Sequence, residues 1–334
     1  MQAWTHEKRN WKDQHGLTTL GTRLREQRRI TQARIQRESS RQLLCRPQGG
    51  LNDNLCQIQK SIIHALRFNR QLIIDTNRSG LRDHFDHYFD TIYPIANIKT
   101  RLTEQHIQEL NGQSCHPSSF TGKLNNYELT YAPEICNFVH SDSGERPCIT
   151  PHDPPETLLL HDQCGGGQGV QALVYFRFQP RIANEIIARL SLLPKRYKAV
   201  HIRHVDVPFD YIEFLATIKP LLNDLNVLIC TDDYRVLRDA RQILSDSTIH
   251  HVANVPDTQG QKLHDNPGIT SQATNIGSLC DLIALANAQT IFFPSSASVY
   301  PSGFSRLAID LSNRNDLLRQ LLGKKNWDLL QYHQ

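Results

Sequence analysis

The feature that most constrains the fold is a repeated alternation of short apolar strands and amphipathic helices in the second half of the chain. Apolar runs at 198–202, 226–230 and 290–293 are typical of buried strands. Residues with helical spacing fill the intervals between these runs. Such alternation favours a parallel sheet with helices on both faces, because each helix carries the chain back to the same end of the sheet. We therefore predict a doubly wound α/β domain.

The first half contains a shorter version of the same pattern. A strand at 43–45, a turn at 49–54, a helix at 55–68 and a strand at 71–75 form one strand, helix, strand unit. A further apolar strand is expected at 157–161. The second half is also expected to contain a strand at 248–252 and helices at 180–193, 211–222, 234–244, 279–288, 301–309 and 316–322.

The length of the chain, 334 residues, corresponds to about two domains at roughly 150 residues each. A hydrophobic fraction of 39% and a charged fraction of 21% are sufficient for a buried core. We predict a basic, helical N-terminal arm over 1–42 and an N-terminal Rossmann-like domain over 43–192. A C-terminal Rossmann-like domain is predicted over 193–334.

Basic charge is concentrated in the N-terminal arm. Residues 1–46 contain eleven Lys or Arg and four acids, a net charge of +7, so the rest of the chain is acidic although the total is +4. The few apolar residues of the arm favour a helix over 18–40, which is either a solvated helix packed on the body or a surface that meets anionic lipid. Trp4 and Trp11 do not form an interleaved aromatic platform, so we expect no nucleic-acid partner.

Eight cysteines are scattered along the chain without a Cys-x-x-Cys pair, which favours reduced thiols over a metal site. No apolar run approaches the roughly 20 residues that span a bilayer, and the N-terminus lacks the apolar core of a secretory leader. We therefore expect a cytoplasmic protein, or one that is peripheral to a membrane through its basic arm.

Three polar clusters directly follow predicted strands of the second half. They are His201-Ile202-Arg203-His204-Val205-Asp206, Thr231-Asp232-Asp233 and Ser295-Ser296-Ala297-Ser298. Ligands of open α/β sheets bind at the carboxyl ends of the strands, where we expect these clusters to meet. An Arg fork, paired carboxylates and hydroxyls near a helix N-terminus suit a ligand with phosphates and a ribose.

Each cluster also has a purely structural interpretation. The run from Thr231 to Asp233 is typical of an N-cap with acids in the first helical turn. Arg203 can pair with Asp206 or Asp210 instead of a ligand. The occurrence of all three clusters at strand ends of one sheet is what favours a binding site.

Together with a Gly-rich turn in the first half, the clusters resemble the GDP-fucose-dependent fucosyltransferase superfamily, which includes α-1,2- and α-1,6-fucosyltransferases. The His-x-Arg motif followed by Asp, the strand ending in Asp-Asp, and the Asp before a strand ending in Ser-Ser all have counterparts in the chain. The turn is similar to the family's Gly-Gly-Leu-Gly loop, with Asn52 where the third Gly usually stands. The matching residues are His201, Arg203, Asp206, Asp232, Asp233, Asp281, Ser295, Ser296 and Gly49 to Asn54.

The resemblance covers about residues 43–75 and 172–310. It implies a GT-B-like fold, in which two Rossmann-like domains turn their parallel sheets toward a central cleft. It also implies a glycosyltransferase that moves L-fucose from GDP-fucose to a hydroxyl of a glycan acceptor, with inversion and without a metal or cofactor. The C-terminal domain would bind the nucleotide sugar, and the N-terminal domain would lie on the acceptor side.

The resemblance further implies roles for individual residues. Arg203 would stabilise the departing diphosphate, and Asp53 or Asp206 would be the general base, with His201 and Glu213 as weaker candidates. The expected substrate-binding residues are Gly49, Gly50, Asn52, Asn54, His201, Asp232, Asp233, Asp281, Ser295, Ser296 and Ser298.

Two other functions remain open at this point. The first is a glycosyltransferase that uses a different nucleotide sugar. The second is a nucleotide- or carbohydrate-binding module that has lost its catalytic activity. Nucleotide release from a panel of GDP- and UDP-sugars would separate the three.

Overall fold

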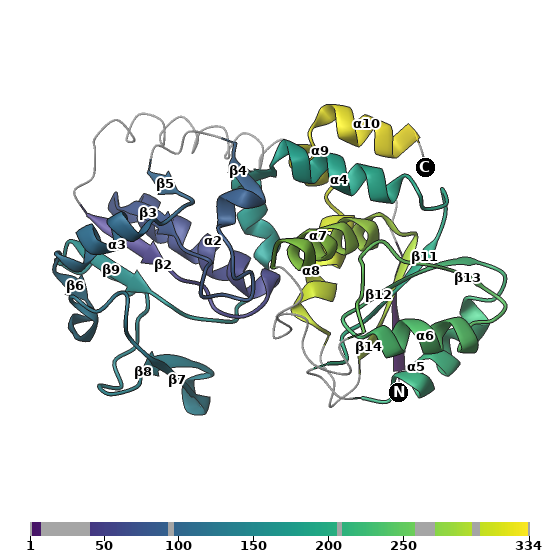
Figure 1. The fold of residues 1–334 in the computed structure, drawn as a ribbon, viewed down its shortest axis with the longest axis horizontal. Coiled ribbons are helices and arrows are strands. Elements are labelled where there is room, and N and C mark those ends of the chain that lie inside the picture. The colour runs from purple at the N-terminus through teal and green to yellow at the C-terminus, as the bar shows by residue number, and fades with distance from the viewer. Residues whose placement is uncertain are drawn as a thin grey trace, which may run out of the picture. The chain divides into compact units, whose positions relative to one another are not determined.

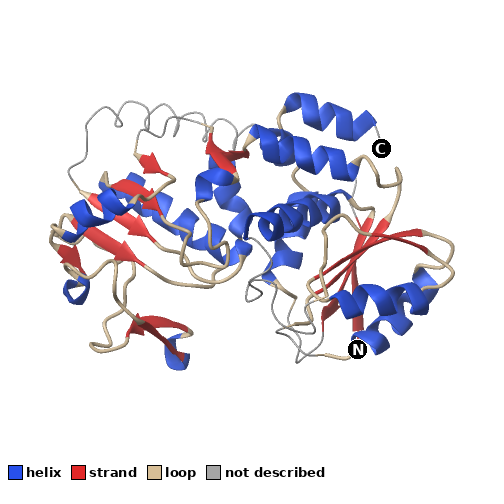
Figure 2. Ribbon diagram, viewed as in Figure 1, coloured by secondary structure: helices blue, strands red, loops and turns tan. Residues whose placement is uncertain are grey.

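The computed structural model describes residues 2–7, 41–92, 97–205, 209–257, 271–295 and 301–332 (Figure 1). The chain divides into two compact units, with the boundary between Phe176 and Arg177. We call these the N-terminal unit and the C-terminal unit, and the strand β1 (Gln2–Glu7) belongs to the latter. Strands and helices alternate in both (Figure 2), and the predicted α/β fold class is confirmed.

The N-terminal unit is built on a parallel five-stranded sheet with the order β5-β3-β2-β9-β6. The predicted strand, helix, strand unit lies at its centre, where α2 (Leu51–Phe68) connects two neighbouring strands. All four residues of β9, the strand predicted at 157–161, are buried, as expected inside a parallel sheet. The strands are β2 (Gln42–Cys45), β3 (Gln71–Ile74), β5 (Ile98–Lys99), β6 (Cys115–His116) and β9 (Leu158–His161).

The two faces of this sheet bury different side chains. One face packs Leu44, Ile73 and Leu158 against a cluster that includes Leu110 and Phe120. The other face is next to α2, whose apolar stripe is fully buried. The smaller elements of the unit are η1 (Phe85–His87), β4 (Phe89–Thr91), α3 (Glu104–Asn111), η2 (Ser118–Phe120) and η4 (Gly169–Tyr175), and β10 (Phe176–Phe178) straddles the boundary.

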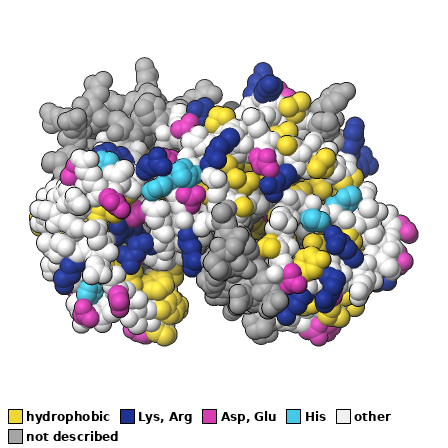
Figure 3. Space-filling model, in the orientation of Figure 1, with side chains coloured by type: hydrophobic (Ala, Val, Ile, Leu, Met, Phe, Trp, Pro, Cys, Tyr) yellow, Lys and Arg dark blue, Asp and Glu magenta, His cyan; other side chains and the backbone are white. Residues whose placement is uncertain are grey.

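A β-hairpin projects from the N-terminal unit. It consists of β7 (Leu129–Ala132), the turn η3 (Pro133–Ile135) and β8 (Asn137–His140). Tyr131 and Ile135 are exposed at its tip, where hydrophobic side chains gather on the surface (Figure 3).

The C-terminal unit has a second five-stranded sheet with the order β1-β14-β11-β12-β13. The three inner pairings among β14, β11, β12 and β13 are parallel, as the alternation of strands and helices predicts. Only β1 is antiparallel, and it covers the outer edge of β14 from Gln2 opposite Ser295 to Glu7 opposite Thr290. The other strands are β11 (Lys198–Ile202), β12 (Asn226–Thr231), β13 (Thr248–His250) and β14 (Thr290–Ser295).

Alternation along β11 assigns its side chains to opposite faces of this sheet. Val200 and Ile202 pack with α5 and α6 in a buried apolar cluster. His201 points the other way and contacts α8. The helices are α4 (Pro180–Leu190), α5 (Tyr211–Ile218), η5 (Lys219–Leu221), α6 (Tyr234–Ile243), α7 (Ser271–Asn287), α8 (Gly303–Ser312), α9 (Asn315–Leu322) and α10 (Lys324–Tyr332).

Three details differ from the prediction. Residues 2–7 form a strand, although the arm was expected to be helical; the helix expected at 18–40 lies outside the described residues. The boundary between units lies before α4 instead of after it, because α4 packs on α7, α9 and α10. Finally, α10 was not predicted.

Candidate functional site

The polar clusters of the C-terminal unit lie at one edge of its sheet. Because β11 and β12 are parallel, with His201 opposite Cys230 and Ile202 opposite Thr231, both strands end at the same level. The backbone N–H of His204 donates to Asp232 Oδ1 at 2.8 Å, and the His204 Nδ1 lies 2.9 Å from Asp233 Oδ2. The structure therefore joins the first two predicted clusters directly.

Within the acidic pair, Asp233 is engaged by its own helix. Its carboxylate accepts the backbone N–H of Arg235 at the start of α6 and binds the Arg235 guanidinium, with a closest distance of 2.6 Å. Burial would raise the pKa of Asp233, but hydrogen bonds from Arg235 and His204 outweigh it and lower the pKa to about 2. The N-cap interpretation therefore describes Asp233 in this structure.

His201 is held in a defined orientation at the end of β11. Its Nδ1 lies 2.7 Å from the Ser305 Oγ, and its ring packs on Phe304. Ser305 Oγ in turn lies 3.1 Å from the Oγ of Ser302, the N-cap of α8. Burial, and then the charge of Arg203, lower the pKa of His201 to about 4. The imidazole is therefore neutral near pH 7.

Arg203 is exposed at the carboxyl end of β11, two residues beyond His201. Ser295 is the half-buried last residue of β14. Three other predicted site residues, Asp206, Ser296 and Ser298, lie outside the described residues.

Asp281 is a buried acid behind the end of β12. It lies on α7 with 8% of its surface exposed, and the thiol of Cys230 and the backbone N–H of Ala253 are bonded to it. Within the described part of the chain, its Oδ1 has no hydrogen-bond partner. Burial raises the pKa of Asp281 to about 7, although both bonds oppose the shift. Such an oxygen can accept a hydrogen bond from a ligand.

The predicted Gly-rich turn of the N-terminal unit has a mainly structural role. Gly49 has φ of +88°, a conformation that favours glycine, and Gly50 is the N-cap of α2. The buried side chain of Asn54 donates to both of their carbonyls, at 2.8 and 2.7 Å. Asn52 accepts the backbone N–H of Gly169. Both side chains therefore shape the turn.

Asp53 is half-buried in the first helical turn of α2, and its side chain lies beside the Gly-rich turn. A Cβ added to Gly49 would lie 2.7 Å from its Oδ2. Its negative charge also raises the pKa of the Cys164 thiol, although burial is the larger cause. Glu213, by contrast, is exposed in the first turn of α5 in the C-terminal unit.

A buried polar network at the carboxyl ends of the N-terminal strands was not predicted. Arg46, Asp75 and Asp162 each follow directly after β2, β3 or β9. Arg46 binds Asp75 at 2.8 Å and Tyr127 at 3.2 Å, and the phenol of Tyr127 donates to Asp162. The strand-end argument that we applied to the second half would have found all three charged residues.

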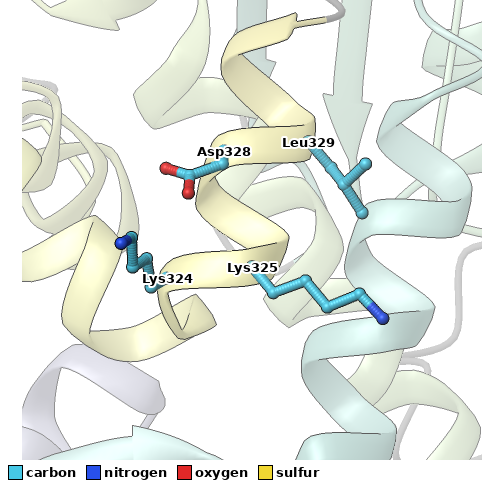
Figure 4. A pocket seen from close by; sticks show the side chains of 4 residues that line it. All are labelled: Lys324, Lys325, Asp328 and Leu329. Carbon is cyan, nitrogen blue, oxygen red and sulfur yellow. The ribbon is translucent and has the colours of Figure 1, made fainter.

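No metal site is present in the described ranges. No three His, Cys, Asp or Glu side chains there lie together as metal ligands would. A shallow hollow of about 640 Å³ lies against α10, and the residues that line it come in two pairs on opposite sides of the helix (Figure 4). They are Lys324 with Asp328 and Lys325 with Leu329, far in sequence from every strand end. Among the helices described, none is long and apolar enough to cross a membrane.

Two α/β units with parallel sheets, and polar residues at the carboxyl ends of their strands, define a GT-B-like fold. Solved structures that the chain resembles include fucosyltransferases. Fucosyltransferase NodZ from Bradyrhizobium matches with a TM-score of 0.52 and 18% identity, over 80% of this chain and 92% of NodZ.

Two further structures were similar. NodZ α-1,6-fucosyltransferase soaked with GDP-fucose matches with a TM-score of 0.51 and 18% identity, over 82% of this chain and 96% of that one. A variant of FUT1 from Arabidopsis thaliana in complex with GDP matches with a TM-score of 0.45 and 10% identity, over 85% of this chain and 72% of FUT1. We draw no conclusion from this match. No family model and no curated protein sequence matches the chain. The likeness to NodZ therefore concerns the fold.

Proposed function

We propose that the chain is a glycosyltransferase that transfers a sugar, L-fucose from GDP-fucose, to a hydroxyl of a glycan acceptor. The observation that carries the proposal is the fold shared with NodZ, which in this chain places Arg203 at the end of β11 and Asp281 behind the end of β12. We further propose inversion at the anomeric carbon and a reaction without a metal.

Arg203 and His201 would bind the diphosphate. Glycosyl transfer leaves negative charge on the nucleotide, and a guanidinium fork positioned beforehand stabilises that charge. Arg203 is exposed at the end of β11, so an anion can reach its guanidinium from solvent without a conformational change. The neutral His201, oriented by Ser305, would add a hydrogen bond. Ser295, at the end of β14, would bind the same diphosphate together with the next residue in sequence, Ser296.

Asp281 would recognise the nucleoside. Its unpartnered Oδ1 is a buried acceptor, and leaving such an atom unsatisfied costs about 1–3 kcal/mol. A ribose hydroxyl or the N–H groups of a guanine would supply the missing donor. Asp232 is the second candidate for this contact, whereas Asp233 is engaged by Arg235.

The general base would be Asp53 or Asp206. His201 is a poor candidate, because a pKa of about 4 makes it a weak base at neutral pH. Glu213 is a weak candidate too, since its exposed side chain lies in no enclosed site. We also keep the proposal that the basic arm associates with anionic lipid at the membrane surface.

A donor panel tests the function. The chain is incubated with GDP-fucose, GDP-mannose and UDP-hexoses in EDTA, and nucleotide release is measured with and without oligosaccharides. We expect release from GDP-fucose and tight binding of GDP without divalent metal. Nucleotide release only from another nucleotide sugar would show that the donor is that sugar and not GDP-fucose. GDP binding without turnover would indicate a binding module that has lost its catalytic activity. A chain that binds no nucleotide would refute the proposal.

A further inference from the structure

The carboxyl edge of the N-terminal sheet carries an exposed arginine in a fixed position. The guanidinium of Arg78, in the loop after β3, lies 4.3 Å from the ring centre of Tyr127, and one of its nitrogens donates to the Tyr127 carbonyl at 3.0 Å. Tyr127 is itself held by Arg46 and Asp162 beneath it. Arg78 is therefore placed before any ligand arrives, with other N–H groups facing solvent.

A second exposed arginine is anchored at the end of strand β9, which is separated from β3 by β2. Arg146 Nε donates to Gln163 Oε1 at 2.7 Å, and Gln163 is fixed by bonds to the carbonyls of Phe138 and Asp162. The terminal nitrogens of Arg146 are left for other partners. Lys and Arg side chains gather on the surface between β9 and the β7–β8 hairpin (Figure 3).

The positive field of this edge also acts on a buried group. His161 is the last residue of β9 and is fully buried. Burial, followed by the charges of Lys60, His64 and Arg146, lowers the pKa of His161 to about 3. The charges of these cationic side chains therefore reach the end of this strand.

Within the described residues, no direct ion pair joins Arg78 or Arg146 to a carboxylate. Asp75 is bound to Arg46, and Asp83 to Tyr88 and His87. Glu145 precedes Arg146 but accepts the backbone N–H of Ser119. Asp162 is buried beneath Tyr127. Burial raises its pKa, although hydrogen bonds from Tyr127 and Gln48 and the charges of Arg46 and Arg78 oppose the shift.

We propose that this edge, presented by Arg78 and Arg146, binds anionic groups of the acceptor, so that the acceptor is an acidic glycan. Carboxylate and phosphate monoester groups share the required chemistry, since both accept two N–H bonds from a guanidinium. The inference rests on the proposed glycosyltransferase function and names the class of its acceptor.

The test compares three matched tetrasaccharides: one of galacturonic acid, one of neutral galactose, and one of galactose with a phosphate monoester. Their dissociation constants are measured by calorimetry on the whole chain saturated with GDP, at low and high salt. We expect either acidic tetrasaccharide to bind at least tenfold more tightly than the neutral one, and high salt to weaken it. Arg78→Gln and Arg146→Gln should each weaken acidic binding about tenfold and leave neutral binding unchanged.

Arg67→Gln is the matched control. Arg67 is also exposed and lies 5.0 Å from the ring centre of Phe68, but it stands at the far end of α2, by the amino end of the sheet. This variant should bind all three sugars like the wild type.

The inference would be overturned if the acidic and neutral tetrasaccharides bound equally well, or if neither bound. It would also be overturned if Arg67→Gln weakened acidic binding as much as Arg78→Gln. Comparison of the dissociation constants of the two acidic tetrasaccharides shows whether the site prefers a carboxylate or a phosphate group. Failure of the proposed function would show separately, as a wild-type chain that binds no GDP.

Discussion

At the scale of single residues, several buried polar groups are satisfied through short chains of contacts. His161 accepts the backbone N–H of Ile149 through Nδ1, so its Nε2 carries the proton and donates to Gln57. Gln57 then donates to the carbonyls of Cys164 and Gly165. Such chains make single polar substitutions costly, because each removal leaves another buried group unpaired.

Arg203→Ala tests the diphosphate contact. The side chain is exposed, so the variant should fold normally, whereas loss of the fork should lower transfer at least about 100-fold. Turnover from GDP-fucose and the melting temperature are measured together. Arg241→Ala, an exposed arginine at the end of α6, is the control. Retention of more than a tenth of wild-type turnover would contradict the assignment.

The raised pKa of Asp281 predicts how the free energy of unfolding depends on pH. Its pKa is about 7 in the folded chain and about 3.8 without burial, so the folded state binds more protons between these values. The contribution of Asp281 to the free energy of unfolding is thus most favourable below pH 4 and declines until pH 7. Asp281→Asn removes this decline, so the variant should gain stability relative to the wild type between pH 5 and 8.

Urea denaturation at the two pH values provides the measurement. Asp328→Asn, at an exposed position on α10, serves as the control and should show no such change. An identical pH dependence for Asp281→Asn and the wild type would contradict the raised pKa.

At the scale of elements, the loops after β2 and β3 pack against each other through glycine. Gly80 donates its backbone N–H to the carbonyl of Gly49 at 3.0 Å. A Cβ at position 80 would lie only 2.6 Å from that carbonyl oxygen. The loop that carries Arg78 is therefore held against the turn that begins α2.

Gly80→Ala should displace this loop. Because the obstacle is backbone, we expect a loss of about 1–3 kcal/mol in the free energy of unfolding. Gly112→Ala is the comparison, since its Cβ would meet Glu109 at 3.5 Å, an ordinary contact. That variant should be neutral or more stable by about 0.4–1 kcal/mol. Equal stabilities in urea would show that the loop yields without strain.

At the scale of the whole molecule, the chain begins in one unit and then passes to the other. The strand β1 belongs to the C-terminal unit, although the N-terminal unit follows it in sequence. Beyond Phe292, where the pairing of β14 with β11 ends, β14 pairs with β1 alone among the described strands. The N-terminus thus covers an edge that would otherwise offer unpaired backbone groups.

Truncation before residue 41 removes β1 together with the arm. We expect a lower melting temperature, by roughly 2–4 °C for each kcal/mol lost, and self-association through the exposed edge of β14. Replacement of 8–40 by a Gly/Ser linker of equal length keeps β1 and should avoid both effects. Scanning fluorimetry and light scattering give the readouts. A truncated chain that matches the linker variant in both would contradict this role.

Much of the fold could be predicted because apolar periodicity reports burial locally. The strands β2, β9, β11, β12 and β14 were each expected within a residue or two, since a short all-apolar run between polar turns is typical of a buried strand. The strand β1 could not be found this way, because its pairing with β14 joins opposite ends of the chain. Long-range pairing of that kind leaves no local pattern.

The sequence by itself determined the α/β class and the residues that stand at the strand ends, because both follow from local order along the chain. Only the tertiary structure decided what those residues do. It assigned Asp233 to capping α6, oriented His201 through Ser305, and left one oxygen of Asp281 unpaired. It also joined Arg46, Tyr127 and Asp162 beneath Arg78. Hydrogen bonds and pKa values depend on neighbours in space, and folding alone determines those neighbours.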